Sequence, residues 1–329
     1  ILSKNKFLKV SAGRSGWQNK DNFKLNTFEK LFQFPEGKII KEKFDNNLNY
    51  IRVISKRKNG KFSNREKNID FIRLSYTNSK KDRINLQKFY EKNSKLIDSV
   101  EDKFGIEREL LLALMGIETN FGTYVGKMDI ISSLATLSFD KRRSEFFTNE
   151  LLILLRLIEN EQIDYKSLYG SWAGAFGFFQ FMPSTMKNYS IDHDGNGYID
   201  LKNNNDAYAS ASNYLNQIGW KTNNPCFYRI DLSEDIPKKY LNISAKKLHD
   251  KKKLKYFRKY IKNNNHIDSK YNKFNVAIIT PDKDIIPDAE TLNPAYIVFD
   301  NYEIILKWNR SLRFALAVCT LKDKFKNEL

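Results

Sequence analysis

The chain is poor in the side chains on which much enzyme chemistry depends. Its three histidines, His193, His249 and His266, are scattered, and its two cysteines, Cys226 and Cys319, form no CxxC pair. The sequence therefore offers little support for a catalytic zinc site or a Ser/His/Asp triad. The cysteines are buried free thiols in the simpler interpretation, or one disulfide in an oxidising compartment, and their spacing does not decide between the two.

Long hydrophobic runs are also absent. No stretch approaches the roughly 18–20 uncharged apolar residues that a membrane-spanning helix needs. The apolar share of 41% and the aromatic share of 14% over 329 residues are nevertheless enough for a packed core. The chain begins at Ile1 rather than Met, so we expect that a segment such as a signal peptide or lipid anchor precedes it.

The net charge of +17 is unevenly distributed along the chain. Residues 1–100 carry 24 Lys and Arg against 10 Asp and Glu, residues 101–220 carry 10 against 16, and residues 221–329 carry 22 against 13. The basic surplus flanks an acidic middle that holds the motifs, so no nucleic-acid partner is expected. The lysines are either an ordinary solvated surface or a means of long-range attraction to a polyanionic envelope or wall.

Hydrophobic periodicity predicts a mainly helical chain with a few strands. Helices are expected over 82–100, over 107–120 with a cap at Gly122, over 144–159, from Pro183, over 206–218 and over 312–322. A further helix is expected in the very basic stretch 246–262, where Leu254, Phe257 and Ile261 share a face. Strands are expected over 227–230, 276–279 and 295–299.

Glu118 is the first candidate for catalysis. It follows Leu111, Leu114 and Met115 by seven, four and three residues, so all four share one helical face. Desolvation favours the neutral form of a carboxylic acid, and a protonated acid is what glycosidic cleavage requires. A helix-end glutamate that turns to solvent or binds a backbone amide is the alternative.

Residues 170–182 combine small residues with aromatic ones. Glycine allows a backbone to approach a ligand closely, and aromatic rings offer faces on which sugar rings can stack. The aromatic residues of the segment are Trp172, Phe176, Phe178, Phe179 and Phe181. Ser171 and Gln180 are polar groups that can hydrogen-bond a sugar in this setting. Tight packing between helices is the alternative explanation for so many small residues.

The loop that starts at Asp192 has the spacing of an EF-hand calcium loop. Oxygen side chains stand at loop positions 1, 3 and 5, glycine at position 6 and a backbone carbonyl at position 7. Asn203 replaces the glutamate of position 12, and Asp206 is placed to complete the shell. We therefore predict a Ca²⁺ site, with Na⁺ as a lesser option and a plain Asx/Gly turn as the alternative. Its ligands would be Asp192, Asp194, Asn196, Tyr198 and Asp206.

Together these blocks resemble the family of membrane-bound lytic murein transglycosylases of the B type, which has a lysozyme-like catalytic core. The resemblance covers about residues 70–220 and 300–320, in the order and spacing of the family. It is carried by residues 118–122, 135–143, 170–175 and 180–184, by the cation loop, and by Asn213-Tyr214 and residues 308–311. Trp172, Phe178 and Trp308 stand where the family usually has tyrosine or another aromatic residue.

The resemblance implies a non-hydrolytic cleavage of peptidoglycan with Glu118 as its one catalytic carboxylate. Glu118 would first act as acid and then as base, leaving 1,6-anhydro-N-acetylmuramic acid ends. Ser171, Gln180, Tyr214, Trp308 and Asn309 would contact the glycan strand. The alternatives are a muramidase-type hydrolase and a non-catalytic peptidoglycan-binding protein on the same fold.

The resemblance also implies the architecture, location and partners. The fold class would be mainly α, or α+β: a lysozyme-like helical core over 106–220 and 301–329, a mostly helical N-terminal region over 1–105 and a small strand-containing insertion over 221–300. The protein would be a monomer of the periplasm or cell envelope, with an outer-membrane anchor outside this chain. Peptidoglycan strands would be its substrate, the bound Ca²⁺ would be structural, and proteins of wall remodelling are candidate partners.

Overall fold

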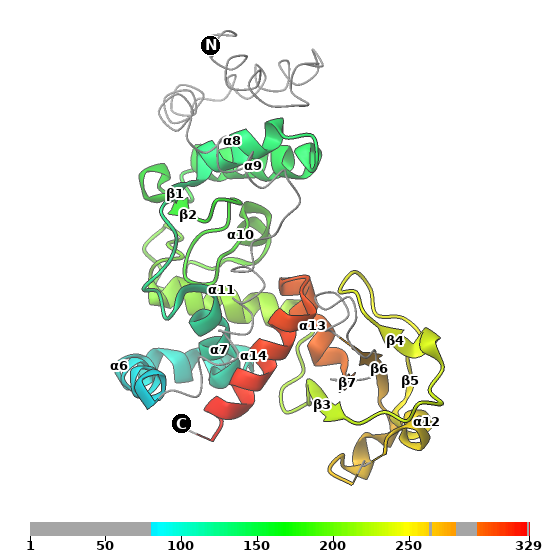
Figure 1. Ribbon diagram of the computed structural model, residues 1–329. Coiled ribbons are helices and arrows are strands. Elements are labelled where there is room, and N and C mark those ends of the chain that lie inside the picture. The colour runs from blue at the N-terminus through cyan, green and yellow to red at the C-terminus, as the bar shows by residue number, and fades with distance from the viewer. Residues whose placement is uncertain (1–79, 263–264, 281–294, 328) are drawn as a thin grey trace. The chain divides into compact units, whose positions relative to one another are not determined.

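The computed structural model describes residues 80–262, 265–280, 295–327 and 329. The described chain forms two compact units, the first with residues 118–214 and the second with residues 80–117 and those from 215 onward (Figure 1). The predictions for residues 1–70 lie outside the described part. Among the described helices, none combines the length and the apolar character needed to cross a bilayer.

The first unit is built around one fully buried helix. All ten residues of α8 (Ile130–Phe139) are buried, and α8 packs along α9 (Ser144–Glu159). The Asp129 carboxylate caps α8 by accepting a hydrogen bond from the Ser132 amide at 2.7 Å. The sequence did not predict α8, because a helix that is buried on every side, with small Ser and Thr side chains among its apolar ones, has no charged face that marks an amphipathic period.

Among the other elements of this unit, α10 packs against α9 and β1 against α8. A buried carboxylate on α9, Glu150, accepts hydrogen bonds from the amide and the hydroxyl of Ser184 at 2.8 and 2.7 Å, and so fixes the start of α10. The remaining elements are β1 (Met128–Asp129), η2 (Tyr165–Ser167), β2 (Tyr169–Gly170), α10 (Pro183–Tyr189) and α11 (Asn204–Gln217). Both α11 and α7 (Arg108–Thr119) cross the boundary between the units.

The second unit contains α6 (Lys80–Phe104), most of α7, α13 (Asp300–Trp308) and α14 (Leu312–Phe325). Glu107 ties the start of α7 to the segment after α11: its carboxylate accepts hydrogen bonds from Trp220 Nε1 at 2.6 Å and from the Asn223 amide at 3.0 Å. Cys226 and Cys319 form a disulfide with a Cα–Cα distance of 6.1 Å. The interpretation as free thiols is therefore wrong, because the fold brings together two residues 93 positions apart.

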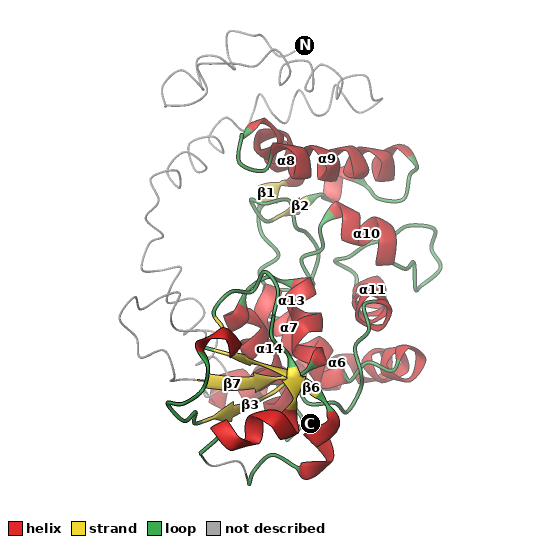
Figure 2. Cartoon of the chain, turned by 90° about the vertical axis from the view of Figure 1, so that its right-hand side faces the viewer, coloured by secondary structure: helices red, strands yellow, loops and turns green. Residues whose placement is uncertain are grey.

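A five-stranded sheet completes the second unit (Figure 2). Its order is β3-β7-β6-β4, with β5 pairing the start of β6, and only β4 and β6 are parallel. The strands are β3 (Phe227–Ile230), β4 (Leu241–Asn242), β5 (Lys252–Lys253), β6 (Asn275–Ile279) and β7 (Ala295–Val298). Short helical turns connect them: η3 (Lys238–Tyr240), α12 (Leu254–Phe257), η4 (Arg258–Tyr260) and η5 (Ser269–Lys273).

The predicted fold class, mainly helical with a small sheet, is confirmed. The helices expected around 82–100, 107–120, 144–159, 206–218 and 312–322 and the three strands are present, with ends shifted by a few residues. The single helix expected over 246–262 is wrong, because β5 pairs with β6 and leaves room only for α12 and η4. Leu254, Phe257 and Ile261 are nevertheless buried together, as predicted. The domain boundaries stay a prediction.

Candidate active site and cation loop

Glu118 lies at the last turn of α7, where the helix leaves its apolar surroundings. Leu111, Leu114 and Met115 on the same face are fully buried, whereas Glu118 is only partly so. The chain then reverses through three left-handed residues, Asn120, Phe121 and Gly122, with φ of 51°, 55° and 77°. Two of these are not glycine, and such conformations persist only where the surroundings hold them. The carboxylate is thus carried on a fixed turn that water can reach.

The turn is fastened to the glycine- and aromatic-rich segment 170–181. The Thr119 hydroxyl donates to the Phe178 carbonyl at 2.8 Å and accepts from the Gly122 amide at 3.1 Å. A Cβ atom on Gly122 would lie 2.8 Å from the Phe178 ring. Glycine at this position therefore serves close packing between the two motifs, and the helix itself ends before it, at Thr119.

Segment 170–181 is a compact set of turns rather than a pair of packed helices. Isolated bridges join Gly170 to Phe176 and Phe176 to Phe181. The Ser171 hydroxyl oxygen accepts the amides of Ala173 and Ala175 at 3.3 and 3.0 Å. Its own hydrogen is then available to donate outward.

Gln180 is held from the other side of the turn. Its side-chain nitrogen donates to the carbonyls of Val125 and Gly177 at 3.3 and 2.9 Å, and its φ of 52° is left-handed. Both amide hydrogens are thus used within the protein, while the oxygen Oε1 accepts no hydrogen bond from the described residues. Gln180 is therefore oriented as a hydrogen-bond acceptor.

The aromatic rings of the segment divide into two groups. Phe176, Phe179 and Phe181 are buried and belong to the core, whereas Trp172 is 37% exposed. Of the rings predicted to stack on a sugar, only those of Trp172 and the half-buried Phe178 are therefore accessible.

Tyr214 on α11 packs against this core. Its ring lies 5.7 Å from that of Phe181 and 4.5 Å from that of Tyr189, measured between centroids. Burial, with a smaller contribution from Tyr189, raises the pKa of Tyr214 to about 12. The hydroxyl therefore stays protonated and able to donate at neutral pH.

Trp308 and Asn309 belong to the second unit and stand at the end of α13. Asn309 caps that helix by donating its amide to the Ile305 carbonyl at 3.0 Å, and its side chain is exposed. Trp308 is partly buried. Their predicted contact with substrate stays a prediction.

The cation loop brings together three of its predicted ligands. Carboxylate oxygens of Asp192, Asp194 and Asp206 lie within 4.8 Å of one another. Asp206 is fully buried, and burial raises its pKa; the amides of Asp200 and His193 act against that rise, and the charge of Asp194 adds to it. Three carboxylates this close favour a bound cation, because they repel one another without it.

The rest of the loop is folded around these carboxylates. Asp192 accepts the amides of Gly195 and Gly197 at 2.8 Å each, and Asn196 accepts that of Tyr198 at 2.8 Å. Asn203 donates to the Asp194 carboxylate at 2.9 Å. Asn203 at position 12 thus orients a predicted ligand, and Asp206 supplies the third carboxylate of the cluster.

Sequence reasoning missed two residues that position the site. Glu150 fixes α10 directly after the Gln180 segment, and Gly126 lies where any Cβ atom would be 2.1 Å from the Gly170 carbonyl oxygen. Glu150 could have been found from sequence, because a carboxylate inside a leucine-rich helix is the same pattern that pointed to Glu118. Gly126 gave no local signal, because its partner is 44 residues away in the sequence.

Comparison with known proteins gives consistent matches. Residues 33–323 match the model of the family described as transglycosylase SLT domain. Over 118 residues, 36% of this chain, the sequence is 43% identical to membrane-bound lytic murein transglycosylase B of Escherichia coli K12. That match spans 33%, about a third, of the length of the curated relative.

Two solved structures are similar over most of the chain. SltB3 of Pseudomonas aeruginosa, in complex with NAG-anhNAM-pentapeptide, matches with a TM-score of 0.67 and 28% identity over 78% of this chain and 66% of that one. The Escherichia coli lytic transglycosylase Slt35, in complex with calcium, matches with a TM-score of 0.63 and 26% identity over 78% of each chain.

Proposed function

The chain belongs to the transglycosylase SLT domain family, and from that premise we propose that it is a peptidoglycan lytic transglycosylase with Glu118 as its only catalytic carboxylate. The observation that carries the proposal is the placement of Glu118. It stands in the last turn of a buried helix, directly before a left-handed turn, and the next residue, Thr119, fastens this helix end to the segment with Ser171 and Gln180. An acid at a water-accessible helix end beside polar and aromatic groups suits cleavage of a bound glycan.

In the proposed reaction Glu118 works twice. As an acid it donates its proton to the oxygen that bridges N-acetylmuramic acid and N-acetylglucosamine, and the bond from C1 to that oxygen breaks. The C6 hydroxyl of the same muramic acid then attacks C1, and the Glu118 carboxylate accepts its proton. No water is consumed, and a 1,6-anhydro end is formed. The tethered hydroxyl has a high effective molarity, so no second carboxylate is needed.

Two contacts to the substrate follow from hydrogen bonds within the first unit. Ser171 would donate its hydroxyl hydrogen to the sugar, because its oxygen already accepts two amides. Gln180 would accept from a sugar hydroxyl through Oε1, because its nitrogen is used by two carbonyls. Trp172 would offer a ring face for stacking, and Tyr214 would add a further contact in the same unit. Trp308 and Asn309, in the second unit, stay predicted substrate contacts.

The cation loop would hold Ca²⁺ in a structural role. The supports are the cluster of three carboxylates, the buried Asp206 and the calcium in the similar Slt35 structure. Asn196 and the Tyr198 carbonyl would supply further oxygen ligands. The ion would neutralise the carboxylates, and the chain around them would keep its present folded course.

With peptidoglycan strands as its substrate, the protein would act in the cell envelope. The glycopeptide in the similar SltB3 structure supports such a ligand. The Cys226–Cys319 disulfide is compatible with this compartment, because disulfides persist in oxidising surroundings.

Digestion of purified peptidoglycan, with mass spectrometry of the products, tests the proposal. The wild-type protein should release muropeptides with 1,6-anhydro ends. Glu118→Gln removes the titrating proton at nearly constant volume, so we expect the rate to fall about 100-fold or more with an unchanged melting temperature.

Glu109→Gln is the matched control, because Glu109 lies on the same helix near its other end. It should retain full activity. Products with reducing ends would indicate a hydrolase instead, and absence of any product from folded wild-type protein would leave a glycan-binding role. Full activity of Glu118→Gln would remove Glu118 from the mechanism.

A further inference from the structure

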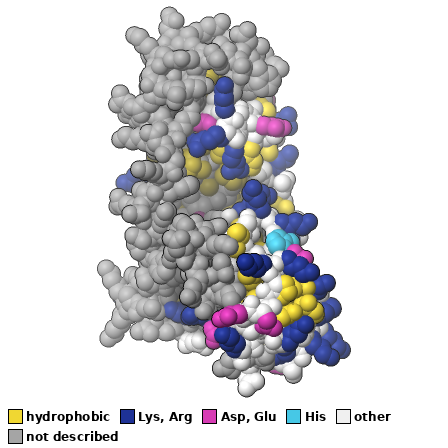
Figure 3. Space-filling model, turned by 45° about the vertical axis from the view of Figure 1, so that its right-hand side comes forward, with side chains coloured by type: hydrophobic (Ala, Val, Ile, Leu, Met, Phe, Trp, Pro, Cys, Tyr) yellow, Lys and Arg dark blue, Asp and Glu magenta, His cyan; other side chains and the backbone are white. Residues whose placement is uncertain are grey.

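The sheet of the second unit carries a large excess of positive charge. Residues 238–273 contain 13 Lys and Arg against two acidic residues, Asp250 and Asp268. Most of these basic side chains are exposed, and Figure 3 shows Lys and Arg side chains around a hydrophobic surface at the lower right of its view. Like charges this dense repel one another in the folded state, and an anionic ligand would relieve that repulsion.

Few of these cations form ion pairs, and Asp235, which precedes the segment, acts on Lys259 only through its electrostatic field. Lys251 pairs with Glu303, Lys270 pairs with Asp268 at 3.2 Å, and His249 lies 2.7 Å from the Asp250 carboxylate. Within the described part of the chain, ten exposed lysines have no ion pair. These ten, named here the lysine surface, are Lys238, Lys239, Lys246, Lys247, Lys252, Lys253, Lys255, Lys259, Lys262 and Lys273.

A tyrosine cluster lies among these lysines. The hydroxyls of Tyr240 and Tyr256 are 3.0 Å apart, and Tyr256 is 37% exposed. Lys259 Nζ stands 5.0 Å from the ring centroid of Tyr256 and 4.7 Å from that of Tyr260, and Lys239 Nζ stands 5.2 Å from that of Tyr240. Two of the cations are thus held against aromatic rings, and one ring also faces solvent.

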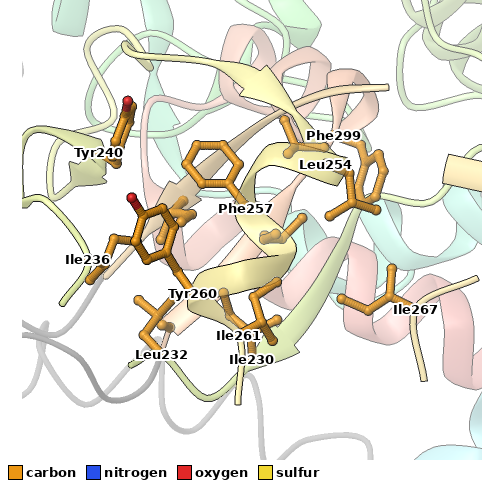
Figure 4. Close-up of a cluster of buried hydrophobic side chains, with 14 residues drawn as sticks. Ile230, Leu232, Ile236, Tyr240, Leu254, Phe257, Tyr260, Ile261, Ile267 and Phe299 are labelled. Atoms are coloured by element: carbon orange, nitrogen blue, oxygen red, sulfur yellow. The ribbon is translucent and has the colours of Figure 1, made fainter. Parts of the chain in front are cut away.

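The fold itself does not need the lysines. The core beneath them is a closed cluster of apolar and aromatic side chains, which Figure 4 shows with the Tyr240 and Tyr260 hydroxyls at one edge. Leu254, Phe257 and Ile261 bury the inner side of the segment, while Lys252, Lys253 and Lys255 remain exposed. Neutral polar residues would cover this core equally well.

We propose that the lysine surface binds peptidoglycan strands through the free carboxylates of their stem peptides, as a second contact apart from the bond that is cleaved. This inference rests on the proposed function. The stem peptides repeat along the strand, so their carboxylates form an extended array of negative charge. An array of lysines, each a point charge on a flexible stem, matches such a ligand. The exposed Tyr256 ring adds a face on which a sugar can stack.

Other polyanions fit the surface less well. The ten cations are all lysine, and the one arginine of the segment, Arg258, is bound to the Ile267 and Asp268 carbonyls, so a bidentate fork for phosphate is lacking there. Only Ile243 and Tyr256 are large hydrophobic residues with more than a third of their surface exposed in 238–273. That is too little apolar surface for insertion into a bilayer.

Binding is measured with the Glu118→Gln protein, so that cleavage does not alter the ligand. The protein is sedimented with purified insoluble peptidoglycan at low and at physiological salt. Reversal of three charges, Lys252→Glu with Lys253→Glu and Lys255→Glu, should weaken binding about tenfold or more at low salt, and the difference should shrink as salt rises. The corresponding Lys→Gln variant should weaken binding less, and both should keep the wild-type melting temperature.

The matched control reverses Lys88, Lys92 and Lys95, three exposed lysines on α6. It makes the same change in net charge and should bind peptidoglycan as the parent does. The parent should bind weakly to peptidoglycan whose carboxylates have been amidated. Its affinity there should equal that of the three-charge variant for unmodified peptidoglycan. Equal losses in both variants, or undiminished binding to the amidated polymer, would overturn the proposal.

Two further ligands separate the sources of charge. Vesicles with anionic lipid and duplex DNA are tested with the same variants. If the three-charge reversal weakens binding to either of them but leaves binding to peptidoglycan intact, the proposal is wrong. Anhydro-muropeptide release by the protein with native Glu118, assayed on short soluble glycans, tests the proposed function separately. If that protein releases no anhydro-muropeptides but still binds peptidoglycan in a salt-sensitive way, the proposed enzymatic activity is wrong and the binding role of the lysine surface stands.

Discussion

At the scale of single residues, the site depends on how closely two backbones approach. Gly126 and Gly170 lie on the two segments that position Glu118 and Ser171, and a Cβ on Gly126 would meet the Gly170 carbonyl oxygen at 2.1 Å. Gly126 also has φ of +88°. Steric exclusion and backbone conformation therefore both require glycine at this position.

Gly126→Ala should accordingly lower the free energy of unfolding by about 2–4 kcal/mol, from overpacking together with a left-handed alanine. Denaturant unfolding in the presence of a chelator measures this loss. Gly197→Ala is the control in the same unit, because Gly197 has φ of +90° but no atom within 4 Å of its would-be Cβ. It should cost only about 1–2 kcal/mol. Equal losses would show that the contact with Gly170 is unimportant.

At the scale of elements, the loops between the helices position the candidate site residues. The cation loop connects α10 to α11, and the Phe178 amide donates to the carbonyl of Leu201, within this loop, at 2.8 Å. The loop is thus joined directly to the segment that bears Gln180. A cation that orders the loop would stabilise this connection as well.

Ca²⁺ should raise the melting temperature of chelator-stripped protein, because an ion bound only by the folded state adds about 2.7 kcal/mol at 100 times its Kd. Asp206→Asn removes one of the three clustered carboxylates and should abolish the rise. Glu159→Gln, an exposed carboxylate of α9 in the same unit, should leave it intact. Calorimetry with and without Ca²⁺ measures the effect, and an unchanged melting temperature in wild-type protein would argue against the site.

At the scale of the whole molecule, distant parts of the sequence are joined within the second unit. The Cys226–Cys319 disulfide links the segment before β3 to α14 across 93 residues. Trp220 and Glu107, 113 residues apart, join the end of the α11 segment to the start of α7. This unit is therefore assembled from both ends of the described chain.

Removal of the disulfide should lower the free energy of unfolding by about 2–4 kcal/mol, because a long closed loop restricts the unfolded chain. The comparison is between oxidised wild-type protein and the double variant Cys226→Ser with Cys319→Ser, by denaturant unfolding. A reductant should destabilise the wild type to a similar extent and leave the double variant unaffected. Identical unfolding of oxidised and reduced wild-type protein would contradict a stabilising bond.

Most of the helices, three of the five strands of the sheet (β3, β6 and β7), the catalytic candidate and the cation loop were predictable from sequence, because each depends on residues close together in the chain. The period of α6, the Leu-rich run before Glu118 and the oxygen ligands from Asp192 to Asp206 are local patterns. Motifs in family order then related these separate patterns to one enzyme class.

Other features were decided only by tertiary structure, because they depend on residues that meet across long stretches of chain. Complete burial left α8 without an exposed, charged face to detect, and pairing of β5 with β6 interrupted the helix expected over 246–262. The disulfide, the Glu150–Ser184 contact and the approach of Gly126 to Gly170 likewise needed the folded chain. Glu118 was evident as a candidate from sequence, whereas the hydrogen bond from the next residue, Thr119, to Phe178 was not, since these two residues are 59 positions apart.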